Sequence, residues 1–186
     1  MKRNKKSNDE VLAPLATHVD KGESVAFVPE NSLPHAFSVV ANRVSATLEN
    51  MYSQSFGLSV VGWRVIAMLG ARAPLSARAL AELTAMDQVS ISRAVDQLVE
   101  LGYVLRKEDM VDRRRVALQL SKRGREVYAQ VVPVLQACEN CLTHGLSKAD
   151  AQILRRVIRN IVERTSSELG KDSDWEAVLQ KYAIAK

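Results

Sequence analysis

The hydrophobic and polar positions of the chain follow a helical period from Leu33 onward. Between Leu33 and Met51 the apolar residues recur at spacings of three and four, which is the stripe of an amphipathic helix. After a break at a glycine, a second and shorter apolar helix is expected from about Ser59 to Leu69. The first 31 residues lack a sustained period and contain prolines and a glycine, so we expect a flexible N-terminal arm there.

Two more helices follow at close spacing. Ser76 and Asp87 each stand where a side-chain oxygen would cap the N-terminus of a helix. A tight turn from Thr84 to Met86 would join the two helices. Such a short connection is typical of a helix-turn-helix, in which the second helix enters the major groove of DNA.

The helix after Asp87 separates into two faces. Ile91, Val95 and Leu98 share one face and are expected to pack against the domain. The opposite face is polar in its first two turns and acidic only later, as a helix that enters DNA by its N-terminus requires. The candidate DNA contacts are Gln88, Val89, Ser90, Ser92 and Arg93. An ordinary amphipathic surface helix would show a similar division, because helix-turn-helix patterns are short.

A β-hairpin is predicted directly after this helix. Its strands are expected at Tyr103 to Arg106 and at Val116 to Leu120, where apolar and polar residues alternate. The turn between them carries three consecutive arginines, a pattern that is often only a solvated turn, although guanidinium groups also suit phosphate oxygens and base edges. The candidate DNA contacts there are Asp112, Arg113, Arg114 and Arg115. A helix-turn-helix followed by such a hairpin is a winged helix, and we expect Arg114 to reach the minor groove.

The C-terminal half contains two long amphipathic helices. The first is expected from Lys122 to about His144, with a bend at Pro133. Ser147 forms a capping pattern with Asp150 for the second. Its apolar stripe is wide and comprises Ile153, Leu154, Val157, Ile158, Ile161 and Val162. One small winged domain cannot cover so much apolar surface, so we expect a second subunit to pack on it and on the helix that begins at Leu33.

The composition narrows the class of protein. The chain has 186 residues, of which 47% are hydrophobic, and this suits one soluble domain. The net charge of +5 and the pI of about 9.4 allow an anionic partner without demanding one. The basic start "MKRNKK" is not followed by the apolar stretch of a signal peptide, and no run reaches the roughly 18 apolar residues of a membrane span. We therefore expect a cytoplasmic protein without membrane contact.

The two cysteines admit a sharper hypothesis. Cys138, Cys141 and His144 follow a C-x2-C-x2-H pattern on one predicted helix, which suggests a redox switch or a metal site. A structural zinc site gathers ligands from separate segments, however, and the sequence has no second pair. We expect buried, inert thiols near a dimer interface, and neither a metal nor another cofactor.

Motifs of the common enzyme classes are absent from the sequence. It contains no G-x-x-x-x-G-K-[ST], no H-E-x-x-H and no G-x-S-x-G, and none of its eight glycines stands in a phosphate-binding cluster. We therefore do not expect an enzyme. A winged-helix adaptor that contacts proteins, without preference for one DNA sequence, is an alternative.

The order of these elements resembles a known family of regulators. The segments "GLSVVGWRVIAMLG" and "MDQVSISRAVDQLVELGYV", with the Asp-x-Arg of "DRRRVALQLSKRG", are similar to the MarR (multiple antibiotic resistance regulator) family over residues 33 to 169. The Leu-Thr that the family usually shows is Leu120 and Ser121 here, followed shortly by Gly124. The resemblance implies a homodimer that binds a pseudo-palindromic operator in double-stranded DNA, usually as a repressor, and releases it when a small molecule binds.

The resemblance also implies an effector site near the hinge between the dimerisation helices and the DNA-binding part. The candidate effector residues are His35, Arg43, Trp63 and Arg64. An aromatic wall with cations suits an aromatic carboxylate or an aromatic acyl-CoA, and the segment from Leu33 to Val65 resembles regulators of aromatic-acid catabolism. Trp63 is equally compatible with a core position, and the arginines with a solvated surface. A redox- or drug-responsive regulator of the same fold is the alternative.

These expectations define a mainly α fold with a small β-hairpin wing, a winged helix-turn-helix with N- and C-terminal dimerisation helices. The expected segments are a flexible arm at 1–31, a dimerisation helix at 32–58, a winged helix-turn-helix at 59–121, dimerisation helices at 122–170 and a tail at 171–186. The tail is expected to form a short helix through Trp175, Val178 and Leu179.

Overall fold

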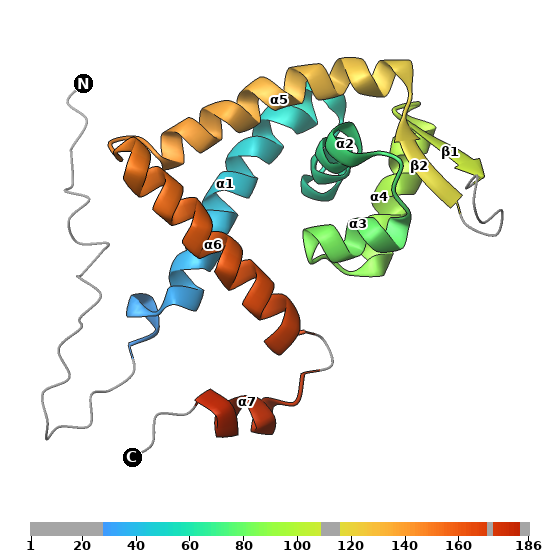
Figure 1. Ribbon diagram of the computed structural model, residues 1–186. Coiled ribbons are helices and arrows are strands. Elements are labelled where there is room, and N and C mark those ends of the chain that lie inside the picture. Colours follow the sequence, from blue (N-terminus) through green and yellow to red (C-terminus); the bar gives the residue numbers. More distant parts are fainter. Residues whose placement is uncertain (1–27, 109–115, 171–172, 183–186) are drawn as a thin grey trace, which may run out of the picture. The chain divides into compact units, whose positions relative to one another are not determined.

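Helices carry most of the described chain, and two strands form a hairpin (Figure 1). The computed structural model describes residues 28–108, 116–170 and 173–182 and divides the chain into two units, residues 1–136 and 137–186. The first unit contains the 3-10 helix η2 (Pro29–Asn31), α1 (Leu33–Phe56), α2 (Val60–Arg72), α3 (Ala77–Thr84), α4 (Gln88–Glu100), β1 (Val104–Glu108), β2 (Val116–Leu120) and most of α5 (Lys122–Leu142). The second contains the end of α5, α6 (Lys148–Glu168) and α7 (Trp175–Tyr182). The predicted mainly α fold with a hairpin is confirmed, and the expected boundaries of the functional segments stay predictions.

Side-chain oxygens begin the helices where the sequence predicts them. Ser76, Asp87 and Ser147 each accept a hydrogen bond from the amide three residues later, at 3.1, 2.8 and 3.1 Å. Each bond satisfies one of the amides that the first turn of a helix leaves unpaired. The predicted caps of α3, α4 and α6 are therefore confirmed.

The first two long helices end later than the periodicity predicts. α1 continues past Met51, because the chain reverses only at Gly57, whose φ of 66° lies in the left-handed region that favours glycine. α2 continues past Leu69 until Ala73, which precedes Pro74 and is therefore disfavoured in a helical conformation. Both helices thus stop at a backbone constraint, and not where their apolar stripes end.

α5 ends at Leu142, two residues before the expected His144. The turn that follows includes Gly145, with a φ of 83°. Pro133 lies inside α5, where it removes one amide from the helical ladder. The bend expected at this proline stays a prediction.

The core of the first unit lies between α2, α4 and the hairpin. Val65, Ile66 and Leu69 supply the α2 side of this core and are at most 1% exposed. The other side consists of Ile91, Val95, Leu98, Val104, Leu118 and Leu120. Complete burial of such a side chain contributes about 1.5 to 3 kcal/mol, so this shared face holds the helices together. The predicted buried positions of α4 are confirmed.

Tyr52 joins α1 to α2 and to the first part of α5. Its ring is 1% exposed, and the ring centroid lies 6.1 Å from that of Trp63 on α2. Its hydroxyl donates to the backbone carbonyl of Val131 on α5 at 3.1 Å. A buried hydroxyl needs such a partner, so this hydrogen bond favours one arrangement of the three helices.

The strands β1 and β2 are antiparallel and lie beside α4 in Figure 1, with Arg106 opposite Leu118. β1 begins one residue after the expected Tyr103, because the Tyr103 amide donates to the Leu98 carbonyl at 2.9 Å and closes α4 instead of joining the ladder. β1 also continues beyond Arg106 to residue 108. On the other side, Leu75 forms an isolated bridge with Leu118, which connects the hairpin to the segment before α3.

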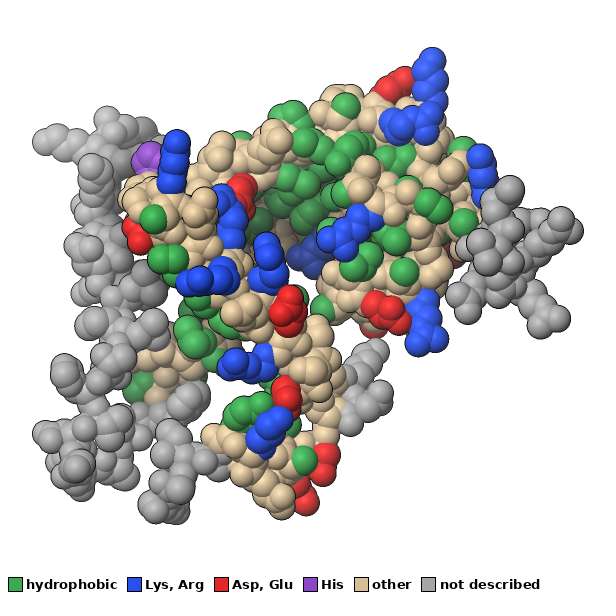
Figure 2. Space-filling view, viewed as in Figure 1, with side chains coloured by type: hydrophobic (Ala, Val, Ile, Leu, Met, Phe, Trp, Pro, Cys, Tyr) green, Lys and Arg blue, Asp and Glu red, His purple; other side chains and the backbone are tan. Residues whose placement is uncertain are grey.

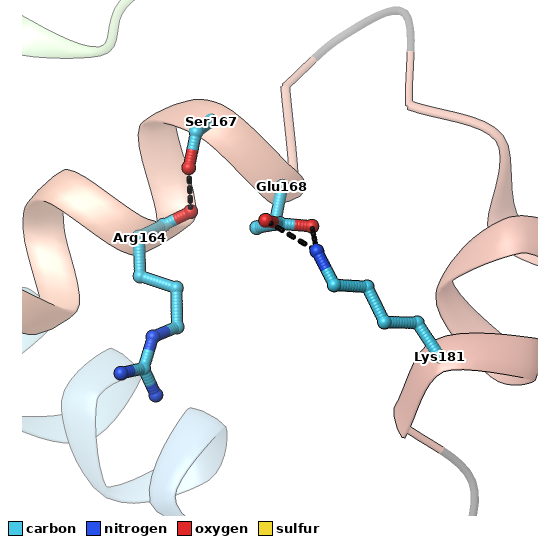
Figure 3. A network of polar contacts seen from close by, with 4 residues as sticks. All are labelled: Arg164, Ser167, Glu168 and Lys181. Carbon is cyan, nitrogen blue, oxygen red and sulfur yellow. Dashed lines mark hydrogen bonds and ion pairs between the residues drawn. The ribbon is translucent and has the colours of Figure 1, made fainter.

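Ion pairs connect the helices of the second unit. Arg155 of α6 donates to Glu139 at the end of α5, with Nε and Oε1 2.9 Å apart. Lys181 of α7 donates to both carboxylate oxygens of Glu168 at 2.7 and 2.8 Å (Figure 3). The hydrogen bond from Lys181 lowers the pKa of the Glu168 carboxyl, and Glu168 raises the pKa of Lys181. The short helix expected around Trp175 is present as α7, and this pair connects it to the end of α6.

Apolar side chains reach the surface of both units, among lysine and arginine side chains (Figure 2). On α1, Phe37 and Val40 are 40% and 47% exposed, and on α6, Val157 and Val162 are 44% and 56% exposed. Among the described residues, no helix combines the length and the apolar character that a membrane crossing needs.

We predict that Gly124→Ala destabilises the first unit by about 1 to 3 kcal/mol, as overpacked sites do. A Cβ at this position of α5 would lie 2.0 Å from the backbone carbonyl oxygen of Tyr103, so the junction between β1 and α5 would have to open. This cost exceeds the gain of about 1 kcal/mol that alanine brings inside a helix. Urea unfolding of the full chain measures the difference.

Gly62→Ala is the matched control for this prediction. A Cβ on Gly62 in α2 would meet its nearest neighbour, the Ser59 hydroxyl oxygen, at 3.4 Å, which is an ordinary contact. We therefore expect Gly62→Ala to be neutral or stabilising. Equal unfolding midpoints for wild type and Gly124→Ala would contradict the role of the close approach at Tyr103.

Candidate nucleic-acid interface

A tight turn sets the start of α4 against the end of α3. The predicted turn from Thr84 to Met86 is present, with Ala85 in the left-handed conformation at a φ of 52° and the Met86 amide bonded to the carbonyl of Ala81 at 3.1 Å. Asp87 then caps α4 through the amide of Ser90. The uncompensated amides of this first turn give the start of α4 a partial positive charge, which favours a nearby phosphate.

The two faces of α4 divide as the sequence predicts. Ile91, Ala94, Val95 and Leu98 are at most 5% exposed, and they form the side that packs on the unit. The candidate DNA contacts lie elsewhere on the helix: Gln88, Val89 and Arg93 are exposed, and Ser90 and Ser92 are half-buried. Val89 is 58% exposed, which leaves its methyl groups free to contact a thymine methyl. Their roles in DNA binding stay predictions.

The arginines of the expected wing turn lie outside the described residues. This applies to Asp112, Arg113, Arg114 and Arg115. The described strands β1 and β2 form one antiparallel pair that follows α4 in the chain. The DNA contacts predicted for these four residues stay predictions.

One polar contact on this surface has no counterpart in the sequence prediction. Arg106 of β1 forms an ion pair with Asp96 on the exposed face of α4. One feature of the sequence could have predicted this ion pair: Arg106 stands at a position of β1 that shares a face with the buried Val104. Alternation along a strand makes such a position apolar in most proteins, so a charged residue there indicates a specific partner.

Trp63 and Arg64 lie where α1, α2 and the turn before α4 meet. Arg64 is half-buried and donates from Nη2 to the Ser45 hydroxyl at 3.0 Å and from Nη1 to the Met86 sulfur at 3.7 Å. Its guanidinium carbon lies 5.5 Å from the centroid of the Trp63 ring. Trp63 is 9% exposed, and its Nε1 donor has no hydrogen-bond partner. A buried unsatisfied donor beside a cation can donate a hydrogen bond to an anionic or carbonyl oxygen of a ligand.

The other two candidate effector residues lie on α1. Arg43 is exposed on α1, two positions before Ser45. His35 is exposed in the first turn of α1, ten residues before Ser45, which is about 15 Å along a helix. The described chain thus groups Trp63 and Arg64 with Ser45 and Met86, while His35 stands at a distance.

A separate concave surface in the first unit has about 350 Å³ of accessible space. It lies between the end of α2, β2 and the start of α5, and its lining includes Leu69, Gln119, Arg125 and Tyr128. Arg125 donates from Nη1 to the Leu120 carbonyl at 2.9 Å. An apolar floor with one cation and a tyrosine ring suits a small carboxylate, so this surface competes with the Trp63 region as a ligand site.

The cysteines are less covered than the sequence analysis expects. Cys138 is half-buried and Cys141 is exposed, and both are free thiols. In the single chain the last turn of α5 is uncovered, with Leu142 50% exposed, and the expectation of thiols buried near a dimer interface stays a prediction. Within residues 28–108, 116–170 and 173–182, no three His, Cys, Asp or Glu residues form a group that could hold a metal ion.

The winged-helix segment is similar to proteins of a known family. Residues 56–115 match the model of the MarR family. The chain is 30% identical to the transcriptional repressor MprA of Escherichia coli (strain K12) over 77 residues, which are 41% of this chain and 44% of MprA.

Solved structures extend this similarity over most of the chain. A MarR family transcriptional regulator from Silicibacter pomeroyi is 26% identical, with 74% of this chain and 92% of that chain covered and a TM-score of 0.67. A MarR family transcriptional regulator from Listeria monocytogenes, crystallised with 26mer DNA, is 14% identical, with 83% and 99% covered and a TM-score of 0.70. At this lower identity the likeness shows the fold alone.

Proposed function

We propose that this chain is a transcription regulator of the MarR family, whose model matches residues 56–115, and that it binds a pseudo-palindromic DNA operator as a homodimer. Members of this family are transcription regulators, not enzymes. The observation that carries the proposal is the exposed face of α4. It combines Gln88, Val89 and Arg93 with a capped, electropositive helix start, while the opposite face is buried.

In this proposal α4 enters the major groove by its N-terminus. Arg93 can form two parallel hydrogen bonds to a guanine, and Gln88 can do the same with an adenine. The wing carries Arg114 to the adjacent minor groove, where the negative potential favours a guanidinium group. A Listeria protein of the same fold was crystallised with 26mer DNA, which supports DNA as the proposed partner.

A second copy of the chain is proposed to cover the apolar faces of the terminal helices. On α6 the exposed apolar side chains are Ile153, Leu154, Val157, Ile158 and Val162. On α1 they are Leu33, Phe37, Val40 and Met51. Monomeric proteins rarely expose contiguous apolar surface of this kind, and two-fold symmetry lets each copy cover the other. A two-fold dimer also presents two copies of α4 to the two halves of a palindrome.

The proposed action is repression, relieved by a small aromatic acid or its coenzyme A thioester. MprA, to which part of this chain is 30% identical, is a transcriptional repressor, and this supports repression as the direction of control. A ligand carboxylate can replace the Ser45 hydroxyl as the acceptor for Arg64, with its ring against Trp63. Since Arg64 also contacts Met86, directly before α4, this exchange would shift the recognition helix.

Arg93→Ala tests operator recognition. We expect a loss of about 1 to 3 kcal/mol in binding to an operator selected from random duplexes, with relaxed preference at one base position in each half-site. The half-sites are expected about ten base pairs apart, centre to centre. Lys148→Ala is the control, because it removes one cation in the second unit, far along the chain from α4. A uniform loss for all sequences would make Arg93 a phosphate contact, and equal binding of operator and random DNA by wild type would refute operator recognition.

Val157→Asp tests the homodimer. A carboxylate in the middle of the α6 stripe would be buried without a partner, so we expect dissociation to monomers in sedimentation and weaker operator binding. Gln152→Asp adds the same charge on the opposite face of α6 and should leave the dimer intact. A Val157→Asp variant that sediments as the wild type does would exclude this face as the interface.

A ligand panel tests the effector. Benzoates, hydroxycinnamates and their coenzyme A thioesters are scored by thermal shift and by release of the operator. An active ligand and the operator should weaken each other's binding equally, by about 1 to 3 kcal/mol. Arg64→Ala should abolish this response and Arg125→Ala should preserve it; the reverse would move the site to the surface beside Tyr128. A response only to lipophilic cations or to thiol oxidants would instead favour a drug sensor or a switch at the exposed Cys141.

A further inference from the structure

We propose that Arg106 is a positioning residue for DNA recognition, which neutralises Asp96 on the recognition helix and holds the wing strand β1 against that helix. This inference rests on the operator binding proposed above. The guanidinium Nη2 of Arg106 donates to Oδ1 of Asp96. Since Asp96 belongs to α4 and Arg106 to β1, the ion pair connects the two elements that would contact DNA.

The place of Arg106 in the hairpin is unusual for a charged residue. It lies two positions after Val104, which is 1% exposed, and opposite Leu118, which is 2% exposed. Side chains two apart on a strand share a face, so Arg106 occupies a position that packing alone would fill with an apolar residue. Its aliphatic stem can lie along that face while the guanidinium group reaches the helix.

The place of Asp96 on α4 explains why it needs a partner. Asp96 follows Arg93 by three residues and Ser92 by four, so its carboxylate lies on the same side of the helix as these candidate DNA contacts. A free carboxylate there would repel phosphates. The charge of Arg106 cancels it, and the wing strand supplies this charge only when it lies next to the helix, as β1 does in Figure 1.

Folding stability is a poor explanation for this ion pair. The side chains of Arg106 and Asp96 are 46% and 58% exposed, and ion pairs at such positions contribute little to stability because water screens them. A contribution to DNA affinity is different, since a DNA backbone brings a dense row of negative charges and excludes water from the contact. The pair should therefore affect operator binding more than the unfolding midpoint.

A double-mutant cycle tests this inference on the full chain. Arg106→Met keeps the apolar stem and removes the charge, and Asp96→Asn removes the opposite charge with little change in shape. Binding to the selected operator and to a random duplex is measured at several salt concentrations. We expect Arg106→Met to weaken operator binding about tenfold, and the double variant to recover about threefold of that loss, since the repelling carboxylate is gone. The unfolding midpoints should change little.

Lys107→Met is the matched control. Lys107 is the next residue of β1, is exposed and points to the other face of the strand. The losses of operator affinity caused by Lys107→Met and by Asp96→Asn should be additive, so the double variant should recover no affinity. Additive effects for Arg106→Met and Asp96→Asn, with a salt slope reduced by about one, would overturn the positioning role and make Arg106 a direct phosphate contact.

The same measurements separate this inference from the proposed function. Equal affinity of wild type for operator and random duplex would overturn operator recognition and the role of Arg106 with it. A clear operator preference in wild type, combined with wild-type affinity in Arg106→Met, would overturn only the role of Arg106.

Discussion

The arrangement of α4, the hairpin and α5 depends on one close approach, between the backbone carbonyl of Tyr103 and Gly124. The same carbonyl accepts the Ser121 amide at 2.9 Å, while the Tyr103 amide closes α4. Ser121 in turn donates to the Gly102 carbonyl at 2.7 Å and caps α5 through the Gly124 amide at 2.9 Å. The end of α4, both ends of the hairpin and the start of α5 therefore meet within a few residues. A side chain at Gly124 would separate them, and the wing would lose its position relative to the recognition helix.

From this junction the hairpin continues beside α4. The charges on the surface that α4 and β1 form together determine which ligands this surface can bind. α4 has a buried apolar face that leaves it no freedom to rotate, so the residues on its other face are presented in one orientation. That face contains an acidic residue, Asp96, as well as Arg93. Arg106 of the hairpin neutralises Asp96. The electrostatic potential that a phosphate backbone would meet on α4 is then set mainly by the first two turns of the helix.

The contacts of Arg64 give the proposed effector a physical route to this surface. One guanidinium group contacts Ser45 on α1, the Trp63 ring and Met86 in the turn before α4. Because the Trp63 Nε1 donor is buried without a partner, the site has a polar group that a ligand oxygen can satisfy. In the proposed mechanism, a ligand at this group acts on α4 through the contact with Met86, because α2 and α4 share the buried core.

The sequence by itself determined the elements whose causes lie close together along the chain. The caps at Ser76 and Asp87, the buried stripe of α4 and the alternation in the hairpin all depend on neighbours within about four residues, so periodicity predicts them. The tertiary structure alone decided which distant groups meet. Arg64 contacts Ser45, which is 19 residues away in the sequence, and Arg106 contacts Asp96, which is ten residues away. His35 lies at a distance from the residues that were predicted to act with it. Local sequence patterns cannot predict these contacts, because the packing of separate helices and strands brings the partners together.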